Sequence, residues 1–171
     1  MEDERRMKTG IVILLFISVF FYTLVYAAGE KEYVSPDGRY TAYVVTISDG
    51  ESKVVVTTKN GRSICSKSYA SEDGEHGFGV LKAVWTPNSA FFVYSMWSSG
   101  GHQPWHCPTD FCSVHESTIR SLDDYVGPVV SPDVETKPPD IVRGKRIGKS
   151  IDDKVDFEVK LSSFGKQGKR K

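Results

Sequence analysis

The sequence predicts an all-β fold, in which two antiparallel β-meanders follow an amino-terminal signal peptide or a single membrane helix. Three observations support this class. Runs of β-branched and aromatic residues alternate with the turn residues glycine, proline, asparagine and aspartate. One turn-and-strand unit recurs at an offset of 51 residues. Beyond residue 28 the chain shows no amphipathic helical pattern of ten or more residues.

The composition is that of a folded chain with no excess of either charge. The 171 residues are 39% hydrophobic and 26% charged, which excludes a disordered, collagen-like or multi-span membrane chain. Lys and Arg total 22 and Asp and Glu total 22, so the formal net charge is zero. A protein that coats nucleic acid needs a strongly basic face, so we expect no nucleic-acid partner.

The amino-terminal segment has the pattern of a secretory signal peptide. Residues 9–29 carry no charge, residues 11–24 are almost wholly apolar, and basic residues precede them. Val25 and Ala27 are the small, uncharged pair that a signal peptidase would recognise before its cleavage point. A basic start, an apolar run and such an exit together predict export.

The same segment is long enough to remain as a membrane anchor. Residues 9–29 would span about 30 Å as a helix, the thickness of a bilayer core. In either case the residues that follow lie outside the cytoplasm, in the periplasm, the secreted space or at the outer side of a membrane. The predicted organisation is a signal peptide or anchor at 1–28, an exported all-β domain at 29–164 and a basic flexible tail at 165–171.

Three strand patterns in the first half of the exported part predict a meander. Tyr40–Ile47, Lys53–Lys59 and Arg62–Tyr69 are the three runs. Asn60-Gly61 joins the last two, and Asn-Gly is the strongest short hairpin signal because a type I′ turn needs positive φ at both central residues. We therefore expect residues 40–69 to form three antiparallel strands.

Further strand patterns follow a polar loop. Val80–Trp85, Ala90–Trp97 and Cys112–Arg120 are predicted strands. Val155–Leu161 alternates apolar and charged residues, the mark of a half-buried strand. Pro128–Asp140 holds four prolines and is predicted to be an extended connector.

The repeated unit carries a resemblance to a known family. Ser35–Tyr43 aligns with Thr86–Tyr94, and each copy places Pro and then Asp or Asn in a tight turn before an apolar strand. This pattern resembles the blades of TolB-type β-propellers and of the propellers that cap prolyl-oligopeptidase-type peptidases. The resemblance covers residues 33–69 and 84–126 and implies two blade-like units.

Two blades are fewer than closed propellers use, which is about four to eight. Ser131-Pro132-Asp133 opens like a third copy, but no strand pattern continues it. Two arrangements stay open: propeller-like blades, or an open sheet or sandwich that uses the same turns. The peptidase activity does not follow from the resemblance, because the sequence has no G-x-S-x-G motif, and no catalytic residue is assigned.

Potentially reactive side chains concentrate in the loop Ser98–His115. It holds three of the four histidines and two of the three cysteines. In an oxidising compartment Cys107 and Cys112 are expected to form a disulfide, which leaves Cys65 as a buried small residue.

A second interpretation of this loop is a metal centre. His102, His106 and His115, with Cys107 and Cys112, offer the imidazole and thiolate ligands that zinc and copper prefer. Their spacing matches no recognised zinc motif, so a zinc or copper site is kept only as the alternative interpretation. No other cofactor is expected.

A third interpretation is a recognition loop. Trp97, Trp105 and Phe111 supply apolar area and His102 a polar contact, while Gly100-Gly101 gives the backbone freedom. We expect a non-enzymatic exported β module that binds a protein or small-molecule ligand of the cell envelope or secreted space through residues 98–115. An uncleaved segment 9–29 would add the membrane as a partner. The alternative is metal carriage or a metal-dependent activity on the three histidines.

Overall fold

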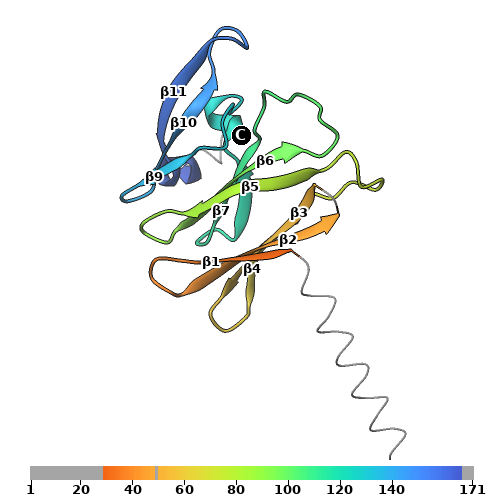
Figure 1. The fold of residues 1–171 in the computed structure, drawn as a ribbon. Coiled ribbons are helices and arrows are strands. Elements are labelled where there is room, and N and C mark those ends of the chain that lie inside the picture. Colours follow the sequence, from red (N-terminus) through yellow and green to blue (C-terminus); the bar gives the residue numbers. More distant parts are fainter. Residues whose placement is uncertain (1–28, 49, 167–171) are drawn as a thin grey trace, which may run out of the picture. The chain divides into compact units, whose positions relative to one another are not determined.

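Antiparallel strands make up most of the described chain, and the all-β class is confirmed. The computed structural model describes residues 29–48 and 50–166, which contain antiparallel sheets of four, four and three strands (Figure 1). The strands are β1 (Glu30–Val34), β2 (Tyr40–Ser48), β3 (Glu51–Thr58), β4 (Ser63–Ser68), β5 (Phe78–Trp85), β6 (Phe91–Ser98), β7 (Thr109–Ser113), β8 (Thr118–Ser121), β9 (Glu135–Lys137), β10 (Ile141–Ile147) and β11 (Lys154–Lys160). The described residues also include the short helix α2 (Asp123–Val126) and the 3-10 helix η1 (Leu161–Lys166).

Each four-stranded sheet is a meander in which consecutive strands pair. The orders are β1-β2-β3-β4 and β5-β6-β7-β8, so the prediction of two blade-like antiparallel meanders is confirmed. The predicted strands between residues 40 and 69 are β2, β3 and β4. β1 escaped prediction because its sequence, EKEYV, is mostly charged, and it forms an edge of its sheet.

The hairpin at Asn60-Gly61 uses a different turn from the one expected. Among the described residues only Gly61 of this pair has a positive φ, at 79°. The Gly61 N–H donates to the Thr58 carbonyl, and the Thr58 N–H donates to the Arg62 carbonyl. This is the three-residue loop in which glycine takes the left-handed position, so the hairpin is right and the type I′ turn is wrong.

The repeated turns make corresponding hydrogen bonds at both copies. The Ser35 hydroxyl donates to Asp37 Oδ1 at 2.8 Å and accepts the Tyr40 N–H at 3.0 Å. The Thr86 hydroxyl donates to Asn88 Oδ1 at 2.8 Å in the same way. Each hydroxyl thus closes the turn that feeds the second strand of its sheet, which is why the unit recurs in the sequence.

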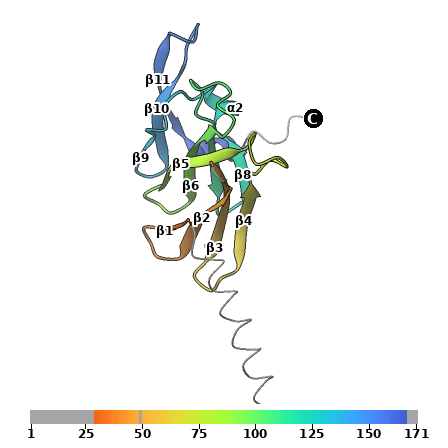
Figure 2. The ribbon, with the colours of Figure 1, turned by 45° about the vertical axis from the view of Figure 1, so that its right-hand side comes forward.

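The central sheet β5–β8 is buried on both faces. Phe92 and Tyr94 of β6 join a cluster shared with β2, β3 and β4, whereas Phe91 and Val93 join a second cluster shared with β10 and β11. Figures 1 and 2 show the orange strands β1–β4 and the blue strands β9–β11 on opposite sides of the green sheet. Burial on both faces explains why β6 is a continuous apolar run rather than an alternating one.

The third sheet, β9–β11, was only partly predicted. The alternation at 155–161 corresponds to β11, where Phe157 is 8% exposed and faces the core. Leu161 leaves the strand and begins η1. The predicted connector 128–140 contains β9, and β10 was missed because its sequence, IVRGKRI, has no alternation.

The predicted strand Cys112–Arg120 is wrong as a single element. It is two strands, β7 and β8, joined by a turn in which Ser117 has a φ of 53°. Ser113 pairs with Thr118 across this hairpin. His115, Glu116 and Ser117 in this turn are polar and exposed, whereas Val114 before them packs against the first core cluster.

Two predicted segments fall outside the described residues. The signal peptide or anchor lies within 1–28, and most of the basic tail lies within 167–171. Within residues 29–48 and 50–166, neither helix has the length and apolar character that a membrane crossing requires.

Candidate functional site

The four residues predicted to bind a ligand lie in different environments. Trp97, near the end of β6, is 44% exposed. Trp105 is half-buried and stacks on His106, with ring centroids 5.4 Å apart. His102 is exposed, and Phe111, in the middle of β7, is 1% exposed and belongs to the second core cluster. The 98–115 loop therefore does not present these side chains as one surface.

The three histidines proposed as metal ligands are also held apart. His102 stacks on the exposed His76, with ring centroids 5.6 Å apart. His106 Nε2 lies 2.6 Å from Asp123 Oδ2, and His115 lies in the β7–β8 turn. No group of three or more His, Cys, Asp or Glu side chains suited to a metal occurs in the part of the chain that the structure describes.

The predicted disulfide is corrected by the structure. Cys112 is bonded to Cys65, 47 residues earlier, and Cys107 is a free thiol. β7 is extended, so Thr109 and Cys112 alone are separated by about 10 Å along the strand. A disulfide needs Cα atoms within about 7 Å. Cys107 precedes Thr109, so the extended strand separates it from Cys112. Cys65 is buried as expected, but as a bonded partner.

Cys107 is not activated as a nucleophile. Burial raises the pKa of its thiol, and the neighbouring Asp123 carboxylate raises the pKa further. A thiol with a raised pKa stays protonated and reacts slowly. Burial also raises the pKa of Asp123, although its hydrogen bond to His106 opposes this shift. These groups therefore hold the loop rather than form a reactive pair.

Polar contacts beside the disulfide join the same two sheets. Lys67 of β4 forms a 2.9 Å ion pair with Asp110 of β7, two residues from each cysteine. Tyr69 donates a hydrogen bond to Asp110 and lies 2.6 Å from the hydroxyl of the fully buried Tyr94. Burial, together with Tyr94 and Asp110, raises the pKa of Tyr69, so its proton stays in place. These groups stabilise the sheet interface and were missed by sequence analysis.

A buried carboxylate fixes the loop that follows β4. Glu51, 1% exposed, accepts hydrogen bonds from the Ser71 hydroxyl at 2.6 Å and from the Gly77 N–H at 2.7 Å. The Ser99 hydroxyl donates to the same carboxylate at 3.1 Å. The bond from Ser71 and the others hold the pKa of Glu51 at about 2. Glu51 therefore connects the 71–77 loop to the start of the segment between β6 and β7.

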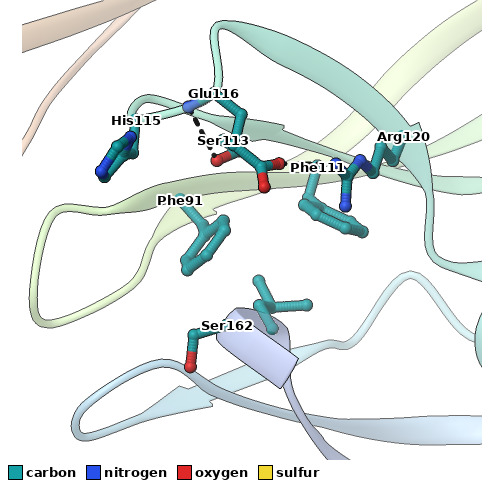
Figure 3. Close-up of a pocket in the computed structure, with 8 residues that line it drawn as sticks. Phe91, Phe111, Ser113, His115, Glu116, Arg120 and Ser162 are labelled. Carbon is teal, nitrogen blue, oxygen red and sulfur yellow. Dashed lines mark hydrogen bonds and ion pairs between the residues drawn. The ribbon is translucent and has the colours of Figure 1, made fainter. Parts of the chain in front are cut away.

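A cavity of about 360 Å³ lies between the β7–β8 hairpin and η1. Figure 3 shows the aromatic rings of Phe91 and Phe111 between the hairpin side chains and the helix. The rings meet edge to face, with centroids 5.9 Å apart. Leu161 of η1 completes the apolar part of the lining. A volume of this size is within the range that small-molecule sites occupy.

The rim of this cavity is polar and carries one charge of each sign. Arg120 Nη2 lies 2.7 Å from Glu116 Oε2, and both side chains are about one-third exposed. His115 and Ser113 stand on the same hairpin, and Ser113 Oγ accepts the Glu116 N–H at 3.4 Å (Figure 3). Ser162 of η1 lies on the opposite side. The buried lining is therefore mostly apolar, with the 2% exposed Ser113 as its polar member, and the exposed lining is polar.

The helical wall of the cavity is firmly docked. Asp140, 1% exposed, accepts the Ser162 N–H on its carboxylate at 2.7 Å, and its carbonyl accepts the Leu161 N–H at 3.0 Å. Phe164 stacks on Tyr125 of α2 with ring centroids 3.9 Å apart. The cavity is therefore formed by ordered elements in the described structure, as ligand sites usually are.

Two of the predicted site residues, Phe111 and His115, line this cavity. Ser113, Glu116 and Arg120 come from the same β7–β8 hairpin, whereas the rest of the lining comes from β6 and η1, which are distant in sequence. The clearest signal for them was the alternation at 155–161, which places Leu161 on the core-facing side. Sequence analysis did not associate Arg120, Glu116 or Ser162 with a site.

Comparison with known proteins leaves the family open. No family model matches the chain, and no curated protein matches it. Among solved structures, the chain is similar to the crystal structure of uncharacterized protein lmo1340 from Listeria monocytogenes EGD-e, with a TM-score of 0.47 and 14% identity. The match covers 71% of this chain and 33% of that chain, so the chain spans about one third of the length of its structural neighbour.

Proposed function

We propose that the chain is an exported β-sheet module that binds a small ligand in the cavity between the β7–β8 hairpin and η1. The expected binding loop, 98–115, contributes Phe111, Ser113 and His115 to the lining. The remaining lining comes from β6, β8 and the turn before β8 in the same sheet, and from η1, which packs on that sheet.

Two observations support export. The amino-terminal sequence combines basic residues, an apolar run and a small-residue exit. The Cys65–Cys112 disulfide joins two sheets in the core, and disulfides of this kind persist in oxidising compartments. The relationship to TolB-type propeller blades stays a prediction, since no family model matches.

The observation that carries the binding proposal is the composition of the cavity lining. Phe91, Phe111 and Leu161 provide an apolar interior, and an Arg–Glu pair stands at the opening. Binding sites for small molecules combine a mostly apolar lining with a few polar groups that orient the ligand.

The proposal is tested by filling the cavity from its exposed side. A library of small fragments is screened by NMR, using amide shifts of the wild-type protein as the readout. Ser162→Trp places a large ring at the cavity wall from an exposed position, and is expected to abolish the shifts around Phe91 and Phe111. Ser163→Trp, on the same helix but outside the lining, is the matched control and is expected to bind normally.

The proposal is wrong if no fragment perturbs the cavity residues of the wild type. It is also wrong if Ser162→Trp and Ser163→Trp bind the same fragments equally well while both keep the wild-type fold by NMR.

A further inference from the structure

The charges at the cavity opening restrict the chemistry of a ligand. Arg120 and Glu116 are the formally charged residues, apart from His115, in the lining of this cavity. Their charged groups are 2.7 Å apart, so any ligand group that meets one of them also lies near the other. The opening is therefore a dipole rather than a basic or acidic patch.

A ligand with a single charge fits this opening poorly. A carboxylate that accepts hydrogen bonds from Arg120 lies close to the Glu116 carboxylate, and like charges at short range oppose binding. An ammonium group that pairs with Glu116 meets the same difficulty at Arg120. A ligand with both groups a few bonds apart satisfies each partner and leaves no uncompensated charge.

The interior favours an apolar body on that ligand. Phe91, which is 8% exposed, offers a ring edge, and Phe111 and Leu161, each 1% exposed, form the apolar floor beneath it, so contact with an aliphatic or aromatic group is favourable. The volume of about 360 Å³ is at the small end of ligand sites, which suits one amino-acid-sized molecule.

We infer that this cavity binds an amino-acid-type zwitterion with an apolar side chain. Its carboxylate pairs with Arg120, its ammonium group with Glu116, and its side chain lies against Phe91 and Phe111. This inference rests on the proposed binding function and names the ligand class of the same site.

The test uses three probes with the same phenyl ring and two-carbon chain. L-phenylalanine carries both charges, 3-phenylpropionate only the carboxylate and 2-phenylethylamine only the ammonium group. We expect the wild-type protein to bind L-phenylalanine about tenfold more tightly than either of the others, the effect of one net charge-assisted hydrogen bond. The affinities are measured by NMR titration of the cavity amides.

Two variants assign the contacts. Glu116→Gln is expected to remove the preference for L-phenylalanine over 3-phenylpropionate, and Arg120→Gln the preference over 2-phenylethylamine. Glu158→Gln removes one member of another exposed ion pair, with Arg143 on β10. It lies outside the cavity lining and is expected to leave all three affinities unchanged.

The outcomes separate this inference from the proposed function. Equal or tighter binding of either singly charged probe, or unchanged preferences in Glu116→Gln and Arg120→Gln, overturns the zwitterion class. If library fragments bind the cavity while L-phenylalanine does not, the class is wrong and the binding function stands. If neither fragments nor probes bind, the proposed function fails together with the inference.

Discussion

Reduction of the Cys65–Cys112 disulfide is expected to destabilise the protein strongly. The bond closes a loop with a sequence separation of 47 residues, and loop-closure entropy for that length corresponds to about 4 kcal/mol. Both sulfurs are buried in the cluster between the first two sheets, so the bond acts where those sheets meet. The Lys67–Asp110 pair beside it depends on the same alignment.

The assay is urea unfolding of oxidised and reduced protein, followed by circular dichroism. A loss of about 4 kcal/mol shifts the midpoint by about 2 M urea if m is about 2 kcal/mol/M. Cys65→Ala with Cys112→Ala is expected to resemble the reduced wild type in both conditions. Cys107→Ala is the matched control, because it removes the free thiol and keeps the redox dependence.

Two results would refute this reasoning. One is a redox difference below about 1 kcal/mol in the wild type, since the loop closed by the bond predicts a larger effect. The other is a bridge that involves Cys107, detected by mass spectrometry of peptides from alkylated, unreduced protein.

Three further predictions follow from buried and terminal groups. Because the pKa of Glu51 is about 2 when folded and 4.5 in its reference state, its contribution to stability is complete above pH 4.5 and is lost as the pH falls toward 2. Unfolding at a series of pH values is expected to show a weaker acid dependence for Glu51→Gln, and an unchanged one would contradict the assignment. Tyr94→Phe removes the hydroxyl that pairs with Tyr69 in the core, and is expected to cost about 1 kcal/mol in thermal unfolding; a neutral effect would mean that this bond contributes nothing. Fractionation of the native host is expected to find the protein outside the cytoplasm with Cys65 and Cys112 oxidised, and a cytosolic protein with free thiols would exclude export.

The strands that carry a local sequence signal, such as an apolar run or a turn motif, were predicted from the sequence. The turns at Ser35 and Thr86 were recognisable because each is closed by residues that follow one another in the sequence. A Ser or Thr comes first, then a proline, then an Asp or Asn whose side-chain oxygen accepts the hydroxyl's hydrogen bond. The sequence of β10 does not alternate apolar and polar residues, so it gave no strand signal. Its burial depends on the elements that pack around it. β1 lacked a strand signal because an edge strand can be charged along its whole length.

The disulfide and the cavity could not be derived from local patterns. Cys65 and Cys112 meet because two sheets stack, and the sequence does not state which strands face one another. Proximity in sequence favoured Cys107, but an extended strand carries neighbouring cysteines apart. Cys65 and Lys67 of β4 and Tyr69 just after it recur at every second residue, and all three contact β7, so this pattern identifies the shared surface once the partner strand is known.

The cavity depends on segments that are even further apart. Phe91 and Leu161 are brought together only when η1 docks on the central sheet. Each looks like an ordinary core residue in the sequence, and Arg120 looks like an ordinary surface residue. Their combination exists only in three dimensions.

The most direct test of ligand binding in this cavity is a crystal structure of the protein with L-phenylalanine at saturating concentration. We expect the ligand between Phe111 and η1, with its carboxylate at Arg120 and its ammonium group at Glu116. A ligand bound at another surface, with this cavity left unfilled, would contradict this expectation.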